Sequence, residues 1–156
     1  MASIKIATGL KTYDIEDQNG NVRGQISFNP SDMNFIKRLA SMEDKLNEYL
    51  KEYTDVTDDI VDSEATESQA DDMIKSLELI VDYDTQVKRI INETFEDDRV
   101  SDVVFGKENC FNIYNGKTFV ERFIDGIVPV IKTDVEAASK ELDDKMSKYT
   151  AHTYEK

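Results

Sequence analysis

The sequence predicts a mainly α fold with a small N-terminal β-hairpin (α+β), in which long amphipathic helices pack as a helical bundle. Two patterns predict it. Asn19-Gly20 separates two short runs of alternating apolar and polar residues, which is a strong hairpin signal. After them, apolar residues recur in steps of four and three, the period of about 3.5 residues of a helix that keeps one face against another helix. These seam residues are Phe35, Leu39, Met42, Leu46, Tyr49, Tyr53, Val56 and Ile60.

Residues 1–30 are expected to form the hairpin. Tyr13 and Ile15 share one face of its first strand, and Ile26 and Phe28 share one face of its second strand. A two-stranded hairpin is marginally stable in water, so it must pack on the helices or join a strand of another subunit. We therefore name these four residues as a candidate oligomer interface, and a hairpin packed on its own core remains the alternative.

Residues 31–105 are expected to form long helices. Pro30 ends the second strand, and Ser31 or Asp32 can cap the first helical turn. No Gly or Pro occurs in the range, so one very long helix competes with two helices joined within 62–70, where the seam becomes polar. We favour the joint, because an unbroken helix would extend roughly 100 Å at about 1.5 Å per residue.

The second helical stretch continues the apolar pattern through Ile74, Leu77 and Val81, which we expect to point inward. Asp84 occupies a position where an apolar residue is expected, which indicates a locally exposed or shifted seam rather than a functional acid. In the first stretch, four seam residues face either an internal helix or a partner protein. This candidate partner-binding seam consists of Leu39, Met42, Leu46 and Tyr53.

The rest of the single domain (1–156) is expected to contain a connection, one more helix and a tail. Residues 106–116 connect the helices through a buried turn of helix that contains Cys110, Phe111, Ile113 and Tyr114. Residues 117–149 form the C-terminal helix. Pro129 removes one amide donor there, which predicts a kink, with a complete break as the alternative. Residues 150–156 are expected to be a flexible tail.

The net charge of −14 limits the partners of this chain. An acidic surface repels nucleic-acid phosphates and anionic head groups, so we expect binding to neither nucleic acid nor membrane. No apolar run approaches the roughly 20 residues of a membrane span. A basic partner protein remains possible, as does an acidic inhibitor that mimics DNA.

The sequence offers no residues arranged for catalysis, metal binding or cofactor binding. The one histidine, His152, lies in the predicted tail, and no Cys/His spacing suits zinc. Cys110 lies among apolar neighbours and is expected to be a packing residue. We therefore predict a protein that is not an enzyme and that carries no cofactor.

Two stretches of the sequence carry a family resemblance. The first comprises Tyr13–Glu16, Gly20–Gly24 and Ile26–Asp32, and the second is Val103–Cys110, followed by Phe119, Phe123 and the helix end at 140–149. Together they resemble the tail assembly chaperones of long-tailed (siphovirus-type) phages and prophages of Gram-positive bacteria. The resemblance covers most of the order of hairpin, long helices, turn and final helix.

The resemblance implies a function without catalysis. Such chaperones bind and solubilise the tape measure protein during tail assembly, associate into oligomers, and act in the cytoplasm of the bacterial host cell without being retained in the mature virion. Another phage structural or scaffolding protein remains the main alternative.

Overall fold

The structure is a computed structural model that describes the backbone of residues 1–62 and 67–154 and the side chains of residues 1–58 and 70–148. It confirms a mainly helical α+β fold with an N-terminal antiparallel β-hairpin. The elements, in chain order, are β1 (Lys11–Glu16), β2 (Val22–Phe28), α1 (Met33–Asp62), α2 (Glu67–Phe95), α3 (Val100–Phe105), β3 (Ile113–Tyr114), β4 (Lys117–Thr118), α4 (Phe119–Gly126) and α5 (Val128–Tyr154).

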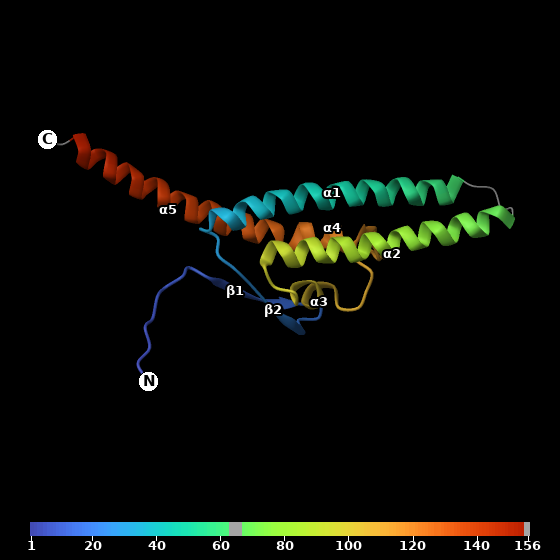
Figure 1. The fold of residues 1–156 in the computed structure, drawn as a ribbon, viewed down its shortest axis with the longest axis horizontal. Coiled ribbons are helices and arrows are strands. Elements are labelled where there is room, and N and C mark those ends of the chain that lie inside the picture. Colours follow the sequence, from blue (N-terminus) through green and yellow to red (C-terminus); the bar gives the residue numbers. More distant parts are fainter. Residues whose placement is uncertain (63–66, 155–156) are drawn as a thin grey trace.

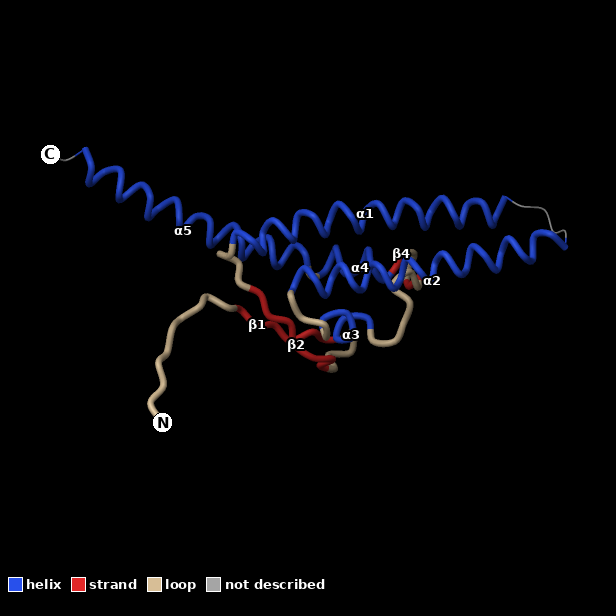
Figure 2. The backbone as a smooth tube through the Cα atoms, in the orientation of Figure 1, coloured by secondary structure: helices blue, strands red, loops and turns tan. Residues whose placement is uncertain are grey.

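The two longest helices, α1 and α2, lie side by side and antiparallel, and α4 and the beginning of α5 pack along them (Figure 1). Asp32 caps the first turn of α1, because its Oδ1 accepts a hydrogen bond of 2.9 Å from the backbone N–H of Asn34. We expected the joint between the two long helices within 62–70, and residues 63–66 of this range lie outside the described residues. The helices α1 and α2 form a helical hairpin, and its far end, where α1 ends and α2 begins, extends beyond the other elements (Figure 2).

The helix α2 ends at Phe95, inside the range 31–105 of the expected long helices. Glu96 has a φ of 52°, and the N–H of Asp97 donates to the carbonyl of Asn92, so the chain turns out of the helix there. The short helix α3 then begins as a separate element and ends at Gly106, as expected for a glycine with a φ of 61°. This turn brings α3 against β2 and α2.

The strands β1 and β2 pair in antiparallel register, with Tyr13 opposite Ile26 and Lys11 opposite Phe28. The register shifts after Ile15, so that Arg23 has no partner in β1 and bulges out. The guanidinium Nε of Arg23 donates to the carbonyl of Val103, 3.1 Å away, which fixes the hairpin on α3.

The connection between α3 and α4 contains a second hairpin. The prediction of a buried helical turn in this connection is therefore wrong for Ile113 and Tyr114. These residues form β3 and are 63% and 53% exposed. Asn115 and Gly116 link β3 to β4 with φ values of 52° and 78°, the positive angles of a type I′ turn. The other two residues follow the prediction, since Cys110 and Phe111 are buried.

The C-terminal helical region is divided at Ile127 into α4 and α5. Thr118 caps α4 in a reciprocal capping box with Glu121. The helical hydrogen bonds Ile127 N–H to Phe123 O and Ile131 N–H to Ile127 O continue across the division. Pro129 therefore interrupts the helix only locally, and α5 continues past the predicted end at Tyr149 to Tyr154. Residues 155–156 of the expected tail lie outside the described residues.

Three groups of aromatic rings join the layers of the core. Phe28, Phe35 and Phe95 link β2 to α1 and α2, with 5.5 Å between the ring centroids of Phe28 and Phe35. Tyr53 stacks on Phe111 with 4.9 Å between centroids, and Phe105 contacts Phe119 edge-on at 4.8 Å. Such pairs add about 0.5–1.5 kcal/mol each beyond the burial of their area.

Candidate interaction surfaces

The four residues of the candidate oligomer interface face the core of their own chain. Ile26 and Phe28 are only 2% and 3% exposed, and Tyr13 and Ile15 are partly buried against the same core. Their side chains therefore pack the hairpin onto the helices, which was the alternative left open by the sequence. A contact between subunits at this hairpin would use the edge of β1 rather than these buried faces.

The candidate partner-binding seam also packs within the chain. Leu39, Met42 and Leu46 are buried in the core, and Tyr53 is partly buried against Phe111. The sequence left open whether this seam faces an internal helix or a partner protein, and in the structure it faces the internal core. Binding of a partner by this seam stays a prediction, and in this arrangement it would require the helices to separate.

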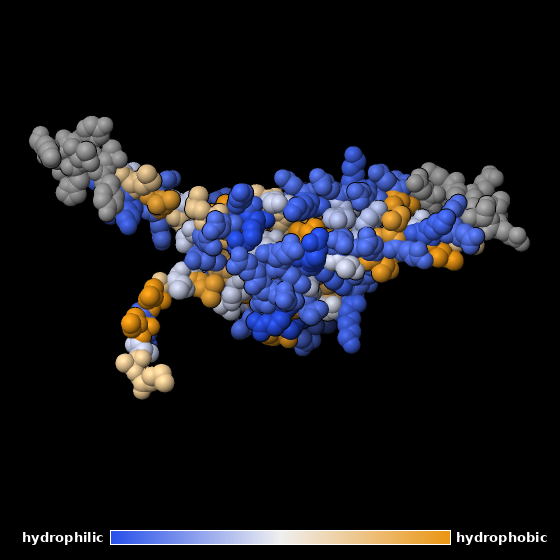
Figure 3. All heavy atoms as spheres, viewed as in Figure 1, coloured by the Kyte–Doolittle hydropathy of each residue, from blue (hydrophilic) through white to orange (hydrophobic). Residues whose placement is uncertain are grey.

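The first half of α2 presents an exposed apolar surface, which we call the distal α2 stripe. We expected Ile74, Leu77 and Val81 to point inward, but they are 54%, 53% and 60% exposed, and Met73 is 50% exposed. The second half of α2 is buried at Val87, Ile90 and Ile91, so one helix is covered at one end and open at the other. Figure 3 shows apolar atoms reaching the surface towards the far end of the helical hairpin.

The distal α2 stripe lies on an acidic helix. Asp71, Asp72, Glu78 and Asp82 are exposed on the same half of α2, and Lys75 is the basic residue among them. Exposed apolar side chains bordered by charged residues are typical of a surface that binds another protein. The charges here favour a partner with basic residues beside its apolar face.

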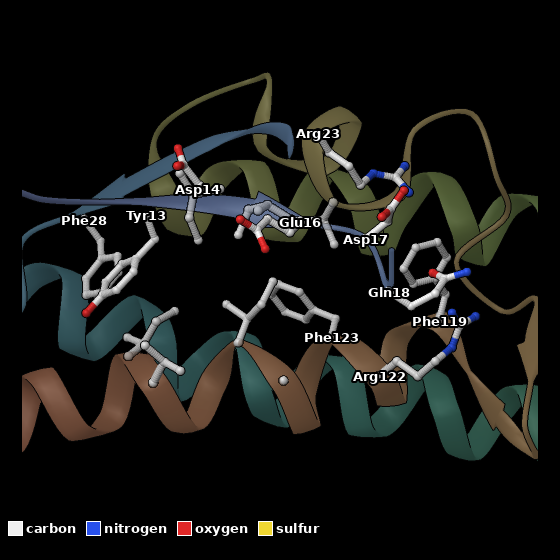
Figure 4. A pocket seen from close by; sticks show the side chains of 17 residues that line it. Tyr13, Asp14, Glu16, Asp17, Gln18, Arg23, Phe28, Phe119, Arg122 and Phe123 are labelled. Atoms are coloured by element: carbon white, nitrogen blue, oxygen red, sulfur yellow. The ribbon is translucent and has the colours of Figure 1, made fainter. Parts of the chain in front are cut away.

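A groove of ≈ 410 Å³ runs between the β-hairpin and the helices α4 and α5. We call it the hairpin groove. In Figure 4, Tyr13 and Phe28 lie at one end, Phe123 and Glu16 in the middle, and Gln18, Phe119 and Arg122 at the other end. Its wall on the helix side is apolar, and Val130 in this wall is 43% exposed.

The two ends of the hairpin groove are held by charged side chains. At one end, Asp134 accepts hydrogen bonds from the Lys11 ammonium at 2.9 Å and from the Tyr13 hydroxyl at 2.8 Å. At the other end, the guanidinium of Arg122 lies 4.3 Å from the ring centroid of Phe119. Along the side of the strand, the exposed carboxylates of Asp14 and Glu16 make the rim acidic.

The first ten residues form an extended N-terminal arm that leaves the body of the molecule (Figure 1). Ile4 and Ile6 on this arm are 92% and 79% exposed. The side-chain amide of Asn29 donates to the carbonyl of Thr8 at 2.6 Å and fixes the base of the arm, where Gly9 has a φ of 77°. The hairpin expected over residues 1–30 is therefore wrong for residues 1–10, although Ile4, Lys5 and Ile6 alternate like a strand with one apolar face.

Asp84 is a structural acid rather than an exposed residue or a shifted seam. Its Oδ1 accepts a hydrogen bond of 2.7 Å from the N–H of Cys110, and its Oδ2 pairs with the Lys88 ammonium at 3.1 Å. The same ammonium donates to the carbonyl of Glu108. Burial, and next the charge of Asp84, raise the pKa of the Cys110 thiol, so this thiol is not activated as a nucleophile.

The described part of the chain holds neither a cluster for a metal ion nor a helix that could span a membrane. No group of three or more His, Cys, Asp and Glu side chains is placed to hold a metal ion there. None of its helices combines the length and the apolar character that crossing a membrane requires. Comparison of the chain with protein-family models, curated proteins and solved structures gave no match.

Proposed function

We propose that this protein is a tail assembly chaperone of a long-tailed phage or prophage of Gram-positive bacteria, which binds and solubilises the tape measure protein without catalysis. The distal α2 stripe is the observation that carries the proposal. A helix with more than half of each of Ile74, Leu77 and Val81 exposed offers an apolar face that another amphipathic helix can cover. The resemblance described above supplies the identity of that partner.

The acidic surface supports the same role. A chaperone for an apolar helical protein must keep the complex soluble, and a strong net charge of one sign does so. The charge of −14 on this chain would repel other copies of the complex while apolar faces are being covered. By the same reasoning the protein binds neither nucleic acid nor membrane. The family resemblance supports action in the cytoplasm of the bacterial host cell.

Co-expression tests this proposal directly. The tape measure protein encoded with this chain is produced in a bacterial host, alone or together with the chaperone, and its soluble fraction is measured after centrifugation. We expect the tape measure protein to be insoluble alone, and soluble and bound to the chaperone when the two are made together. An unchanged soluble fraction would contradict the proposal.

Finished virions give a second readout. A chaperone is released during tail assembly, so the protein should be absent from purified virions analysed by mass spectrometry. Its presence there in a fixed ratio to the tail proteins would instead identify it as a structural component.

A further inference from the structure

We propose that the N-terminal arm of one copy of this chain binds in the hairpin groove of a second copy, where it adds a strand along the free edge of β1. The proposal goes beyond the proposed function, and either of the two can hold without the other. It is carried by the shape, the side-chain pattern and the charge of the arm and the groove.

The edge of β1 is open to a new strand. In the part of the chain that the structure describes, β1 has a strand neighbour on one side, which is β2. The other edge leaves backbone groups that a further strand can pair with. The hairpin groove lies along β1, so a strand added there would also lie against the apolar wall of α4 and α5.

The arm has the pattern that such a site requires. In an extended strand Ile4 and Ile6 point to the same side, where they would meet Ile127 and Val130 in the apolar wall. Eight extended residues reach about 26 Å, and the six residues of β1 need about 20 Å, so the arm can pair along the whole strand. Burial of two isoleucine side chains that are now almost completely exposed would stabilise the pairing.

The charges of the two surfaces are complementary. Lys5 lies between the two isoleucines, and the arm contains no acidic residue in a chain of net charge −14. The rim of the groove carries the exposed carboxylates of Asp14 and Glu16. An added strand places Lys5 on the side opposite to Ile4 and Ile6, where it can approach these acids.

The base of the arm directs it towards another molecule. Asn29 holds the carbonyl of Thr8, and the turn at Gly9 sends residues 1–8 away from their own hairpin groove (Figure 1). To reach that groove the arm would have to break this contact and reverse within two residues of β1. A second copy can accept the arm without either change.

The test uses full-length variants and light scattering after gel filtration. We expect the wild-type protein to have a mass that is a multiple of 17.8 kDa, and the variant I4T/I6T to be monomeric. Threonine keeps the β-branched shape but is polar. The matched control S3T/A7T changes the other side of the same arm and should keep the wild-type mass. A wild-type mass in I4T/I6T, or a monomeric wild type, would overturn the proposal.

A complementation experiment separates exchange between copies from folding back within one copy. I4T/I6T has a free groove but a defective arm, whereas V130K has an intact arm and a lysine in the groove wall. Each variant alone should be monomeric, and an equimolar mixture should form a complex. A mixture that remains monomeric would overturn exchange between copies.

A peptide provides the direct binding measurement. A synthetic peptide of residues 1–11 should bind to I4T/I6T, and the peptide carrying the two threonines should bind at least roughly tenfold more weakly, since two apolar side chains are lost. Equal binding of both peptides would count against the proposal. A chain that stays monomeric but still solubilises the tape measure protein would overturn the arm exchange and leave the proposed function intact.

Discussion

The hydroxyl of Tyr13 donates a hydrogen bond of 2.8 Å to Oδ2 of Asp134 and so joins strand β1 to helix α5 across 121 residues of sequence. Lys11 contacts the other oxygen of the same carboxylate at 2.9 Å, and only 11% of the Asp134 side chain is exposed. Burial tends to raise the pKa of Asp134, but the hydrogen bonds from Lys11 and Tyr13 and the charge of Lys11 outweigh it and hold the pKa below 3.8.

This contact predicts a pH-dependent difference between the wild type and D134N. A carboxyl whose pKa is lowered by folding stabilises the protein above its ordinary pKa, and this contribution is lost as the pH falls through the folded-state value. The difference in urea midpoint between the wild type and D134N should therefore shrink as the pH falls below 3.8. The hydrogen bond with Asp134 raises the pKa of Lys11 and of Tyr13, so the difference should also shrink above about pH 10.

A double-mutant cycle with Y13F controls for unrelated acid effects. If the Tyr13–Asp134 hydrogen bond is the cause, the destabilisation of Y13F/D134N should be smaller than the sum of the two single changes. Strict additivity at neutral pH would contradict the coupling.

The second prediction concerns Asp84 and the connection that it fixes to α2. D84A leaves the N–H of Cys110 without its acceptor, which should lower the free energy of unfolding by about 1–3 kcal/mol. D84N keeps an oxygen that can accept this hydrogen bond and should recover part of the loss. Chemical denaturation measures both changes.

Labelling of the single cysteine gives a local readout of the same contact. Cys110 is fully buried, so a maleimide should react with it only when the connection opens. The reaction should be faster in D84A than in the wild type, with D84N between them. Equal rates in all three proteins would show that Asp84 does not hold the connection.

Helical periodicity and turn chemistry made much of the fold predictable. The 3.5-residue pattern of α1 correctly placed Leu39, Met42 and Leu46 on one buried face, because a face that packs over several helical turns gives a regular apolar spacing. Asn19-Gly20 correctly located the first hairpin. The same dipeptide at Asn115-Gly116 forms the second hairpin, and we overlooked it because only two residues lie in each strand.

The surfaces were less predictable than the core. Periodicity continues along α2 through Ile74, Leu77 and Val81, yet these side chains are exposed while Ile90 and Ile91 are buried. A sequence pattern shows that one side of a helix is apolar, but not how far the neighbouring elements reach to cover it. Asp84 is similar, since its partner Cys110 lies 26 residues away and local spacing could not reveal the contact.

The third prediction concerns the close packing of Gly24 on Val103. A Cβ atom at position 24 would lie 2.8 Å from Cγ2 of Val103, closer than Cβ atoms normally approach, and a tight 3.0 Å from Cγ1. G24A should therefore lower the free energy of unfolding by about 1–3 kcal/mol through overpacking. Removing the two methyl groups leaves only the Cβ of residue 103, at 3.4 Å. We expect G24A to cost less in the V103A background than in the wild type, as measured by urea unfolding.

The last prediction separates binding by the distal α2 stripe from its role in stability. Ile74 and Leu77 are 54% and 53% exposed, and glutamine is a good helix former, so I74Q/L77Q should change the free energy of unfolding by about 0.5 kcal/mol or less. The same variant should lose most of its ability to solubilise the tape measure protein, because two polar side chains replace the apolar face.

Two controls complete the comparison. I113Q changes an isoleucine outside the stripe that is 63% exposed, and this variant should solubilise the partner as well as the wild type. L46A removes a side chain with 0% exposure, so it should cost about 2–5 kcal/mol and impair solubilisation only by unfolding the protein. If I74Q/L77Q is as stable and as active as the wild type, the stripe is not the surface that binds the partner, and the exposed part of α5 becomes the next surface to change.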